Sequence, residues 1–298
     1  MYKILDQITK PRIQELSSFS KEFEMYIDVL RLDEIHPIVS GNKWYKLKYY
    51  LQEAKQLNKE TILTFGGAYS NHIIAAAYAC KASGFKSIGI IRGEESLNLS
   101  TTLEQAKKLG MELYFVSRQD YVFKKDIANQ FTDAYVIPEG GEGELGIKGA
   151  STILENVKLK KYNHIIGACG TGTMISGILK VCNPNQQIIG INVLKGFEEL
   201  ENKIKSNVVD DEFGDRLTVF NDYHFGGYAK HPAQLIDFMN YLWQREKIPT
   251  DIVYTSKLFY ALQDLLLKNY FPKKSNLLII HSGGLQGNDS LAIGSLLF

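Results

Sequence analysis

The chain has 298 residues, of which 45% are hydrophobic, so it can bury one large core or two smaller ones. Its 34 basic and 33 acidic residues leave a net charge of +1, which argues against nucleic acid or a charged membrane surface as a partner. Three cysteines without a C-x-x-C pair indicate neither a disulfide framework nor a metal site, and no apolar run is long enough to cross a bilayer, so we expect a metal-free protein of the cytoplasm.

Short apolar runs of strand type alternate along the chain with segments of helical period. The predicted strands are TILTF, SIGII, ELYFV, AYVIP, HIIGA, QIIGINV and LLIIH, at residues 61–65, 87–91, 112–116, 134–138, 164–168, 187–193 and 277–281. Helices are predicted at residues 47–57, 70–83 and 233–243. This alternation is typical of an α/β protein with open, mostly parallel, twisted sheets flanked by helices.

Two stretches interrupt this rhythm. The glycine-rich string IPEGGEGELGIKG, at residues 137–149, separates the first four predicted strands from the last three and indicates a domain junction. The polar segment 203–215 is expected to be a surface excursion without chemistry.

A glycine-threonine turn follows the predicted strand at residues 164–168. The turn, at residues 170–173, precedes a predicted helix, and such turns hold anions because free N–H groups and the helix dipole face the ligand. It lacks the glycine spacing of a dinucleotide fingerprint and the Lys-Ser/Thr of a P-loop. We therefore expect a phosphate that is not part of a nucleoside triphosphate, although a turn needed only for packing fits this motif alone equally well.

Two other turns carry polar residues into a predicted helix. Ser70 and Asn71 follow a Gly-Gly pair, where they can cap the helix or receive a substrate carboxylate, and capping is the simpler interpretation. Lys43 follows Ser-Gly-Asn and precedes a helix expected to begin near Lys46. Such a lysine is usually solvated, but within a cleft its pKa falls and its amine can attack an aldehyde.

The order of these strings resembles one family. GNK, GG-x-x-SNH, the glycine-threonine turn, GGY, VYT-x-K and H-x-GG, from Gly41 to Gly284, are similar to the strings of pyridoxal-phosphate (PLP) dependent 1-aminocyclopropane-1-carboxylate (ACC) deaminases and D-cysteine desulfhydrases. The resemblance implies PLP fold type II, the tryptophan-synthase-β-like fold, and a homodimer. It also implies a large domain of residues 1–45 and 139–298, with a smaller domain of residues 46–138 inserted.

The resemblance assigns cofactor contacts to three of the strings. Lys43 would hold PLP as a Schiff base, and Asn71 would contact the phenolic oxygen of the pyridine ring. The residues implied around the cofactor phosphate are Gly170, Thr171, Gly172 and Thr173.

Substrate contacts are implied in the same way. Ser70, Asn71 and His72 would receive the substrate carboxylate. Tyr228 and Tyr254 match two active-site tyrosines of the family, and either could orient the substrate or move a proton.

Departures from the family pattern bear on the substrate. Tyr45 replaces a frequent arginine, so any role of that arginine is lost or supplied elsewhere. Thr255 stands where ACC deaminases carry a glutamate that pairs with the pyridine nitrogen, and Ser282 stands where they tend to carry leucine, whereas desulfhydrases carry a hydroxyl residue at both positions. A hydroxyl does not hold the pyridine proton as a carboxylate does, and this favours elimination of a good leaving group over opening of a cyclopropane ring.

We therefore expect a PLP-dependent lyase that acts on a small amino acid. In this hypothesis D-cysteine or a similar β-substituted amino acid displaces Lys43, whose freed amine takes the α-proton. The products would be pyruvate and ammonia, with sulfide from cysteine. ACC deamination is the alternative within the family, and a PLP- or phosphate-binding protein without turnover is the alternative from another class.

Overall fold

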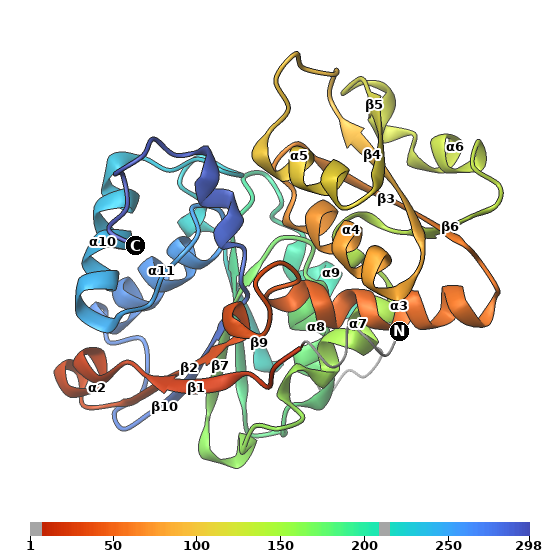
Figure 1. Cartoon of the computed structure of the whole chain (residues 1–298). Coiled ribbons are helices and arrows are strands. Elements are labelled where there is room, and N and C mark those ends of the chain that lie inside the picture. Colours follow the sequence, from red (N-terminus) through yellow and green to blue (C-terminus); the bar gives the residue numbers. More distant parts are fainter. Residues whose placement is uncertain (1–7, 209–214) are drawn as a thin grey trace.

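Two separate sheets form the core of the computed structural model, which describes residues 8–208 and 215–298 (Figure 1). The larger sheet has the order β1 (Arg12–Glu15), β2 (Tyr26–Arg31), β10 (Asn276–His281), β7 (His164–Cys169), β8 (Gln187–Asn192) and β9 (Leu217–Phe220). The smaller sheet has the order β5 (Met111–Val116), β4 (Lys86–Arg92), β3 (Thr61–Gly67) and β6 (Ala134–Ile137). Every pairing is parallel except that of β1 with β2, which confirms the α/β fold with two mostly parallel sheets.

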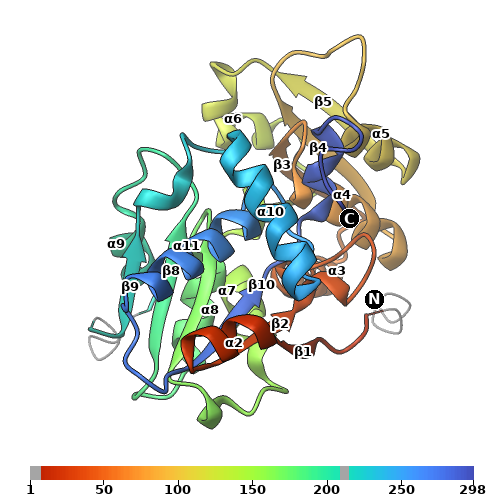
Figure 2. The ribbon, with the colours of Figure 1, turned by 90° about the vertical axis from the view of Figure 1, so that its left-hand side faces the viewer.

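Helices pack on both faces of the sheets. They are α2 (Ser17–Phe23), α3 (Asn42–Gln56), α4 (Asn71–Ser83), α5 (Thr101–Lys108), α6 (Lys124–Asn129), α7 (Glu144–Ser151), α8 (Thr173–Val181), α9 (Leu200–Ser206), α10 (Ala233–Glu246) and α11 (Thr255–Leu267). Successive side chains of the central strands point to opposite faces of the larger sheet. Ile166 packs in a hydrophobic cluster with side chains of α2, α10 and α11, whereas Ile165 packs in a second cluster with side chains of α3, α4 and α8. Figure 2 shows α2, α10 and α11 together on one side of the molecule.

All seven predicted strands are confirmed, and β1, β2 and β9 were not predicted. The prediction that a helix begins near Lys46 is wrong, because α3 begins at Asn42 and its first turn includes Lys43. The segment 203–215 is not wholly irregular, since α9 extends to Ser206; residues 209–214 of that segment lie outside the described residues.

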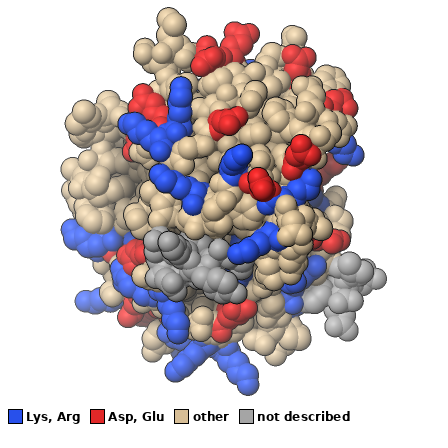
Figure 3. All heavy atoms as spheres, turned by 45° about the vertical axis from the view of Figure 1, so that its right-hand side comes forward, with Lys and Arg blue, Asp and Glu red and all other residues tan. Residues whose placement is uncertain are grey.

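The division of the strands agrees with the expected domain limits. The smaller sheet uses only residues between Thr61 and Ile137, and the larger sheet uses residues on both sides of that segment. The two domains and the homodimer nevertheless stay predictions. Within the described ranges, no helix is both long and apolar enough to span a membrane. Figure 3 shows one face of the molecule, on which basic and acidic side chains are mixed, as the net charge suggests.

Candidate active site

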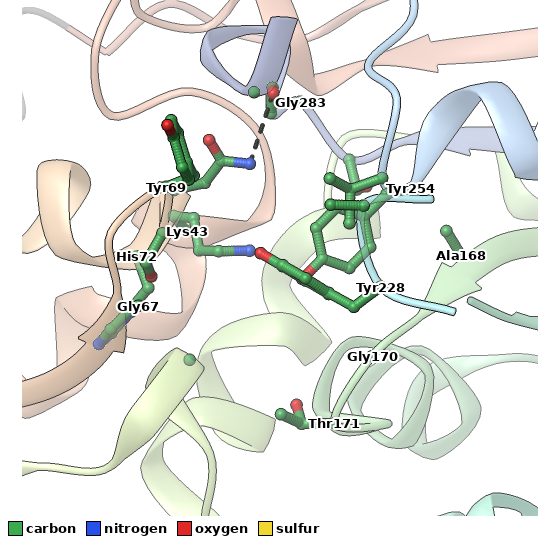
Figure 4. Close-up of a pocket in the computed structure, with 18 of the residues that line it drawn as sticks. Lys43, Gly67, Tyr69, His72, Ala168, Gly170, Thr171, Tyr228, Tyr254 and Gly283 are labelled. Carbon is green, nitrogen blue, oxygen red and sulfur yellow. Dashed lines mark hydrogen bonds between the residues drawn. The ribbon is translucent and has the colours of Figure 1, made fainter. Parts of the chain in front are cut away.

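A cavity of about 710 Å³ lies where strand ends from both sheets meet the first turns of helices. Its wall includes the start of α3, the β3–α4 loop, the β7–α8 loop and the segment after β10. The two loops and the segment after β10 follow the carboxyl ends of parallel strands, where α/β proteins usually bind ligands. In Figure 4, Lys43, Tyr228 and Tyr254 extend toward one another across this cavity.

Lys43 is held in the cavity wall by a close backbone contact. Gly41, the residue before α3, has φ +67° and ψ −149°, and a Cβ atom there would lie 1.8 Å from the carbonyl oxygen of Ser282. Only glycine allows this approach, and it turns the first residues of α3 toward the cavity. The amine of Lys43 donates a hydrogen bond to Oδ1 of Asn42 at 2.9 Å and lies 5.6 Å from the centre of the Tyr254 ring.

Burial sets the charge state of Lys43. Loss of solvation lowers the pKa of its amine to about 8, although the carboxylate of Asp251 opposes this shift. A neutral amine is the form that attacks an aldehyde, so this environment prepares Lys43 for covalent chemistry near neutral pH.

The β7–α8 loop presents free backbone donors to the same cavity. Gly172 has φ +82°, and no side chain caps α8, so the amides of its first turn lack intrahelical acceptors. Gly170, Thr171 and Gly172 line the cavity, whereas Thr173 is buried and its hydroxyl lies 2.8 Å from that of Thr171. Lys46 adds a buried amine to the cavity wall, and burial together with the charge of Lys43 lowers its pKa to about 7.

The start of α4 is both capped and open to the cavity. Ser70 accepts a hydrogen bond from the Ile73 amide at 3.4 Å, so the capping interpretation holds. Asn71 donates to the carbonyl of Gly284 at 3.4 Å, and its buried Oδ1 has no partner among the described residues. His72 lies 2.8 Å from the Thr64 hydroxyl, and burial and then the charge of Lys43 lower its pKa to about 3, so it is neutral.

The two family tyrosines lie together opposite Lys43. Tyr228 and Tyr254 have ring centres 6.2 Å apart in an edge-to-face arrangement. Burial raises the pKa of Tyr254 well above its usual value. Both phenols are therefore protonated at neutral pH and can serve as proton donors.

A buried lysine holds the loop that carries Tyr228. Lys257, on the first turn of α11, is fully buried and donates hydrogen bonds to the carbonyls of His224 at 2.9 Å and Gly227 at 2.7 Å. The loop has positive φ at two residues other than glycine, Phe225 and Ala229, so part of its backbone is strained and needs support.

Lys257→Met is expected to destabilise the protein by about 2 kcal/mol, because two loop carbonyls lose a charged donor. Urea denaturation measures this change in the free energy of unfolding. Lys268→Met, at an exposed lysine just beyond the same helix, is the control and should change it by less than about 0.5 kcal/mol. Equal stability of the two variants would show that Lys257 does not support the loop.

Thr255 and Ser282, which distinguish the two activities of the family, differ in position. Ser282 lines the cavity, but Thr255 is fully buried and is not among the lining residues. The Thr255 hydroxyl donates to the carboxylate of Asp251 at 2.6 Å, and that carboxylate also accepts the amides of residues 253, 254 and 255. The single hydroxyl proton of Thr255 is thus already donated to Asp251. Toward any other group, the Thr255 oxygen can act only as a hydrogen-bond acceptor.

These residues fit PLP. The β7–α8 loop and Lys46 match the charge of a phosphate, and Asn71 offers an unpartnered buried oxygen beside the lysine that would bind the aldehyde. Sequence reasoning had assigned no role to Asp251 or Lys257. Asp251 lies four residues before Thr255, where α11 begins. An aspartate just before a helix often accepts hydrogen bonds from the first amides of that helix, so this position could have indicated the role of Asp251.

Comparison with known proteins shows the family of the chain. A model of the pyridoxal-phosphate dependent enzyme family matches residues 4–283. A Thermotoga maritima protein, provisionally named 1-aminocyclopropane-1-carboxylate deaminase, is 32% identical over 95% of this chain and 96% of its own length. D-cysteine desulfhydrase of Serratia proteamaculans is 23% identical over 91% of this chain and 90% of its own length. The crystal structure of an ACC deaminase homologue has a TM-score of 0.81 at 27% identity, over 95% of this chain and 91% of that one.

Proposed function

The chain belongs to the pyridoxal-phosphate dependent enzyme family, within the group of ACC deaminases and D-cysteine desulfhydrases, and on this premise we propose that it eliminates the β-substituent of a small amino acid such as D-cysteine. The observation that carries the proposal is the amine of Lys43, which lines the same cavity as two helix N-termini suited to anions and has a lowered pKa.

Each part of the cavity has a role in this proposal. The first turn of α8 and Lys46 bind the cofactor phosphate, and Lys43 anchors the aldehyde carbon. The start of α4, with Ser70 and Asn71, binds the substrate carboxylate and so fixes the α-carbon near Lys43. His72 contributes no charge there, because its imidazole is neutral.

Proton transfer follows from the same geometry. Bound PLP supplies an electron-withdrawing ring that stabilises negative charge at the α-carbon. The amine of Lys43, once released by the substrate, takes the α-proton, and its lowered pKa suits this task. Tyr228 and Tyr254 lie across the cavity from Lys43, where a phenol can protonate the departing β-substituent. Hydrolysis then gives pyruvate and ammonia.

Ser282 supports elimination over ring opening. It places a hydroxyl in the cavity wall where ACC deaminases tend to carry leucine. Thr255 supports the proposal less than its sequence position suggests, because its hydroxyl proton is engaged by Asp251. The substrate argument therefore depends mainly on Ser282.

Pyruvate release from PLP-loaded protein offered D-cysteine, L-cysteine and ACC in parallel tests the proposal. We expect D-cysteine to be turned over with a kcat/KM at least tenfold above that of ACC. Ser282→Leu should reduce this ratio. A higher kcat/KM for ACC would contradict the elimination proposal in favour of the deaminase activity, and no turnover of any of the three would contradict both.

A further inference from the structure

The cavity carries more positive charge than PLP and a zwitterionic amino acid require. Its lining lysines and arginines, among the described residues, are Lys43, Lys46, Arg92 and Arg118. The lining carboxylate is Glu139, which already forms an ion pair with Lys124 at 2.5 Å.

The anions of the proposed reaction account for only part of this charge. A cofactor phosphate is matched by Lys46 and the first turn of α8, and the substrate carboxylate by the start of α4. Lys43 is bonded to the aldehyde of the cofactor, so it is not counted among the groups that could bind a further anion. Arg92 and Arg118 therefore have no anion assigned to them.

The two arginines come from neighbouring strand ends of the smaller sheet. Arg92 ends β4 and is the register partner of Val116, which ends β5, and Arg118 follows two residues later. Adjacent strands lie about 4.8 Å apart, so both arginines extend from the same short stretch of the cavity rim. Figure 1 shows β4 and β5 side by side in this sheet.

Arg92 lies close to the expected substrate position. Its guanidinium nitrogen is 3.9 Å from the point that a Cβ atom of Gly67 would occupy, and Gly67 begins the loop that leads to Ser70. Within the described part of the chain, neither arginine has a carboxylate within ion-pair distance. Arg92 lies over the ring of Tyr121, 5.9 Å from its centre, but this contact uses the face of the guanidinium group and not its N–H donors.

We propose that Arg92 and Arg118 form an anion-binding subsite at the cavity mouth, which selects amino acids whose β-substituent is itself negatively charged, such as a phosphate ester. This inference rests on the proposed elimination. The α-proton passes to Lys43, the bond from the β-carbon to the ester oxygen breaks, and phosphate leaves with the electron pair. With one water consumed, O-phosphoserine gives pyruvate, ammonia and phosphate.

The test compares O-phosphoserine with O-acetylserine of the same chirality, because the two differ mainly in the charge of the leaving group. Arg92→Gln and Arg118→Gln should each lower kcat/KM for O-phosphoserine by roughly tenfold to a hundredfold, the range for a lost charged hydrogen bond. Turnover of O-acetylserine should change by less than about threefold. Lys86→Gln, at the opposite end of β4, is the matched control and should affect neither substrate.

A binding measurement separates this inference from the proposed function. Calorimetric titration of the PLP-loaded Lys43→Ala protein with the same two amino acids needs no turnover. Tighter binding of O-phosphoserine that depends on Arg92 and Arg118, without pyruvate release from the unaltered protein, would support the subsite and refute the elimination. Equal effects of the arginine variants on both ligands, no effect on either, or no binding of O-phosphoserine would overturn the subsite.

Discussion

Lys43→Ala is expected to lower turnover by roughly 10²–10⁴-fold, the range for loss of a positioned general base, and to prevent covalent attachment of PLP. The reason is that Lys43 combines two tasks in the proposed reaction, anchoring the aldehyde and taking the α-proton. Pyruvate release measures the first effect. The protein mass after borohydride reduction measures the second, because reduction makes the lysine-bound cofactor permanent.

Lys55→Ala is the matched control for this variant. Lys55 is exposed on the last turn of the same helix, α3. The Lys55→Ala variant therefore removes a lysine from this helix without changing the cavity. It should retain both turnover and the mass increment. A Lys43→Ala protein that still gained the increment would place the attachment on another lysine, of which Lys46 is the nearest candidate in the cavity wall.

Gly41→Ala is expected to destabilise the protein by about 3–5 kcal/mol, the largest stability effect that we predict. The added Cβ would lie 1.8 Å from the carbonyl oxygen of Ser282, and the φ and ψ of this residue suit glycine alone. Relief of the clash requires the start of α3 to separate from the segment after β10. Urea denaturation at saturating PLP measures the loss.

Gly84→Ala separates the clash from the backbone preference. Gly84 also has positive φ, at the end of α4, but a Cβ there would meet nothing within 4 Å. We expect a loss of about 1 kcal/mol at Gly84. Similar losses in the two variants would mean that the contact between Gly41 and Ser282 relaxes without cost.

The strands predicted from sequence are those with short apolar runs, whether they are buried or, like β5 and β6, partly exposed. Parallel strands such as β3 and β7 appear as continuous apolar runs, which local pattern detects. β2 was missed because its string YIDVLR contains Asp28 and Arg31. Both are buried, and the partners of Asp28, such as the Tyr162 hydroxyl at 2.7 Å, are remote in sequence. Pairing of this kind cannot be read from a local window.

The candidate site was predictable as a set of motifs but not as a set of contacts. The order of the strings indicated that Lys43, Asn71 and the glycine-threonine turn serve one cofactor, and the structure brings them to one cavity. The engagement of Thr255 by Asp251 was not predictable, because it depends on where α11 begins. Arg92 was overlooked for a similar reason: only the pairing of β4 with β5 makes it a neighbour of the segment that holds Arg118.

The position of β10 has a consequence for the order of folding during synthesis. This strand lies between β2 and β7, pairing with both, although it is the last of the described strands to leave the ribosome. The smaller sheet comes from one continuous segment and can form early, whereas the larger sheet cannot close until Asn276–His281 emerges. Until then β2 and β7 expose unpaired edges, which invites aggregation. A nascent chain is therefore expected to be prone to aggregation, and the cavity to be incomplete, until residues 276–281 have emerged.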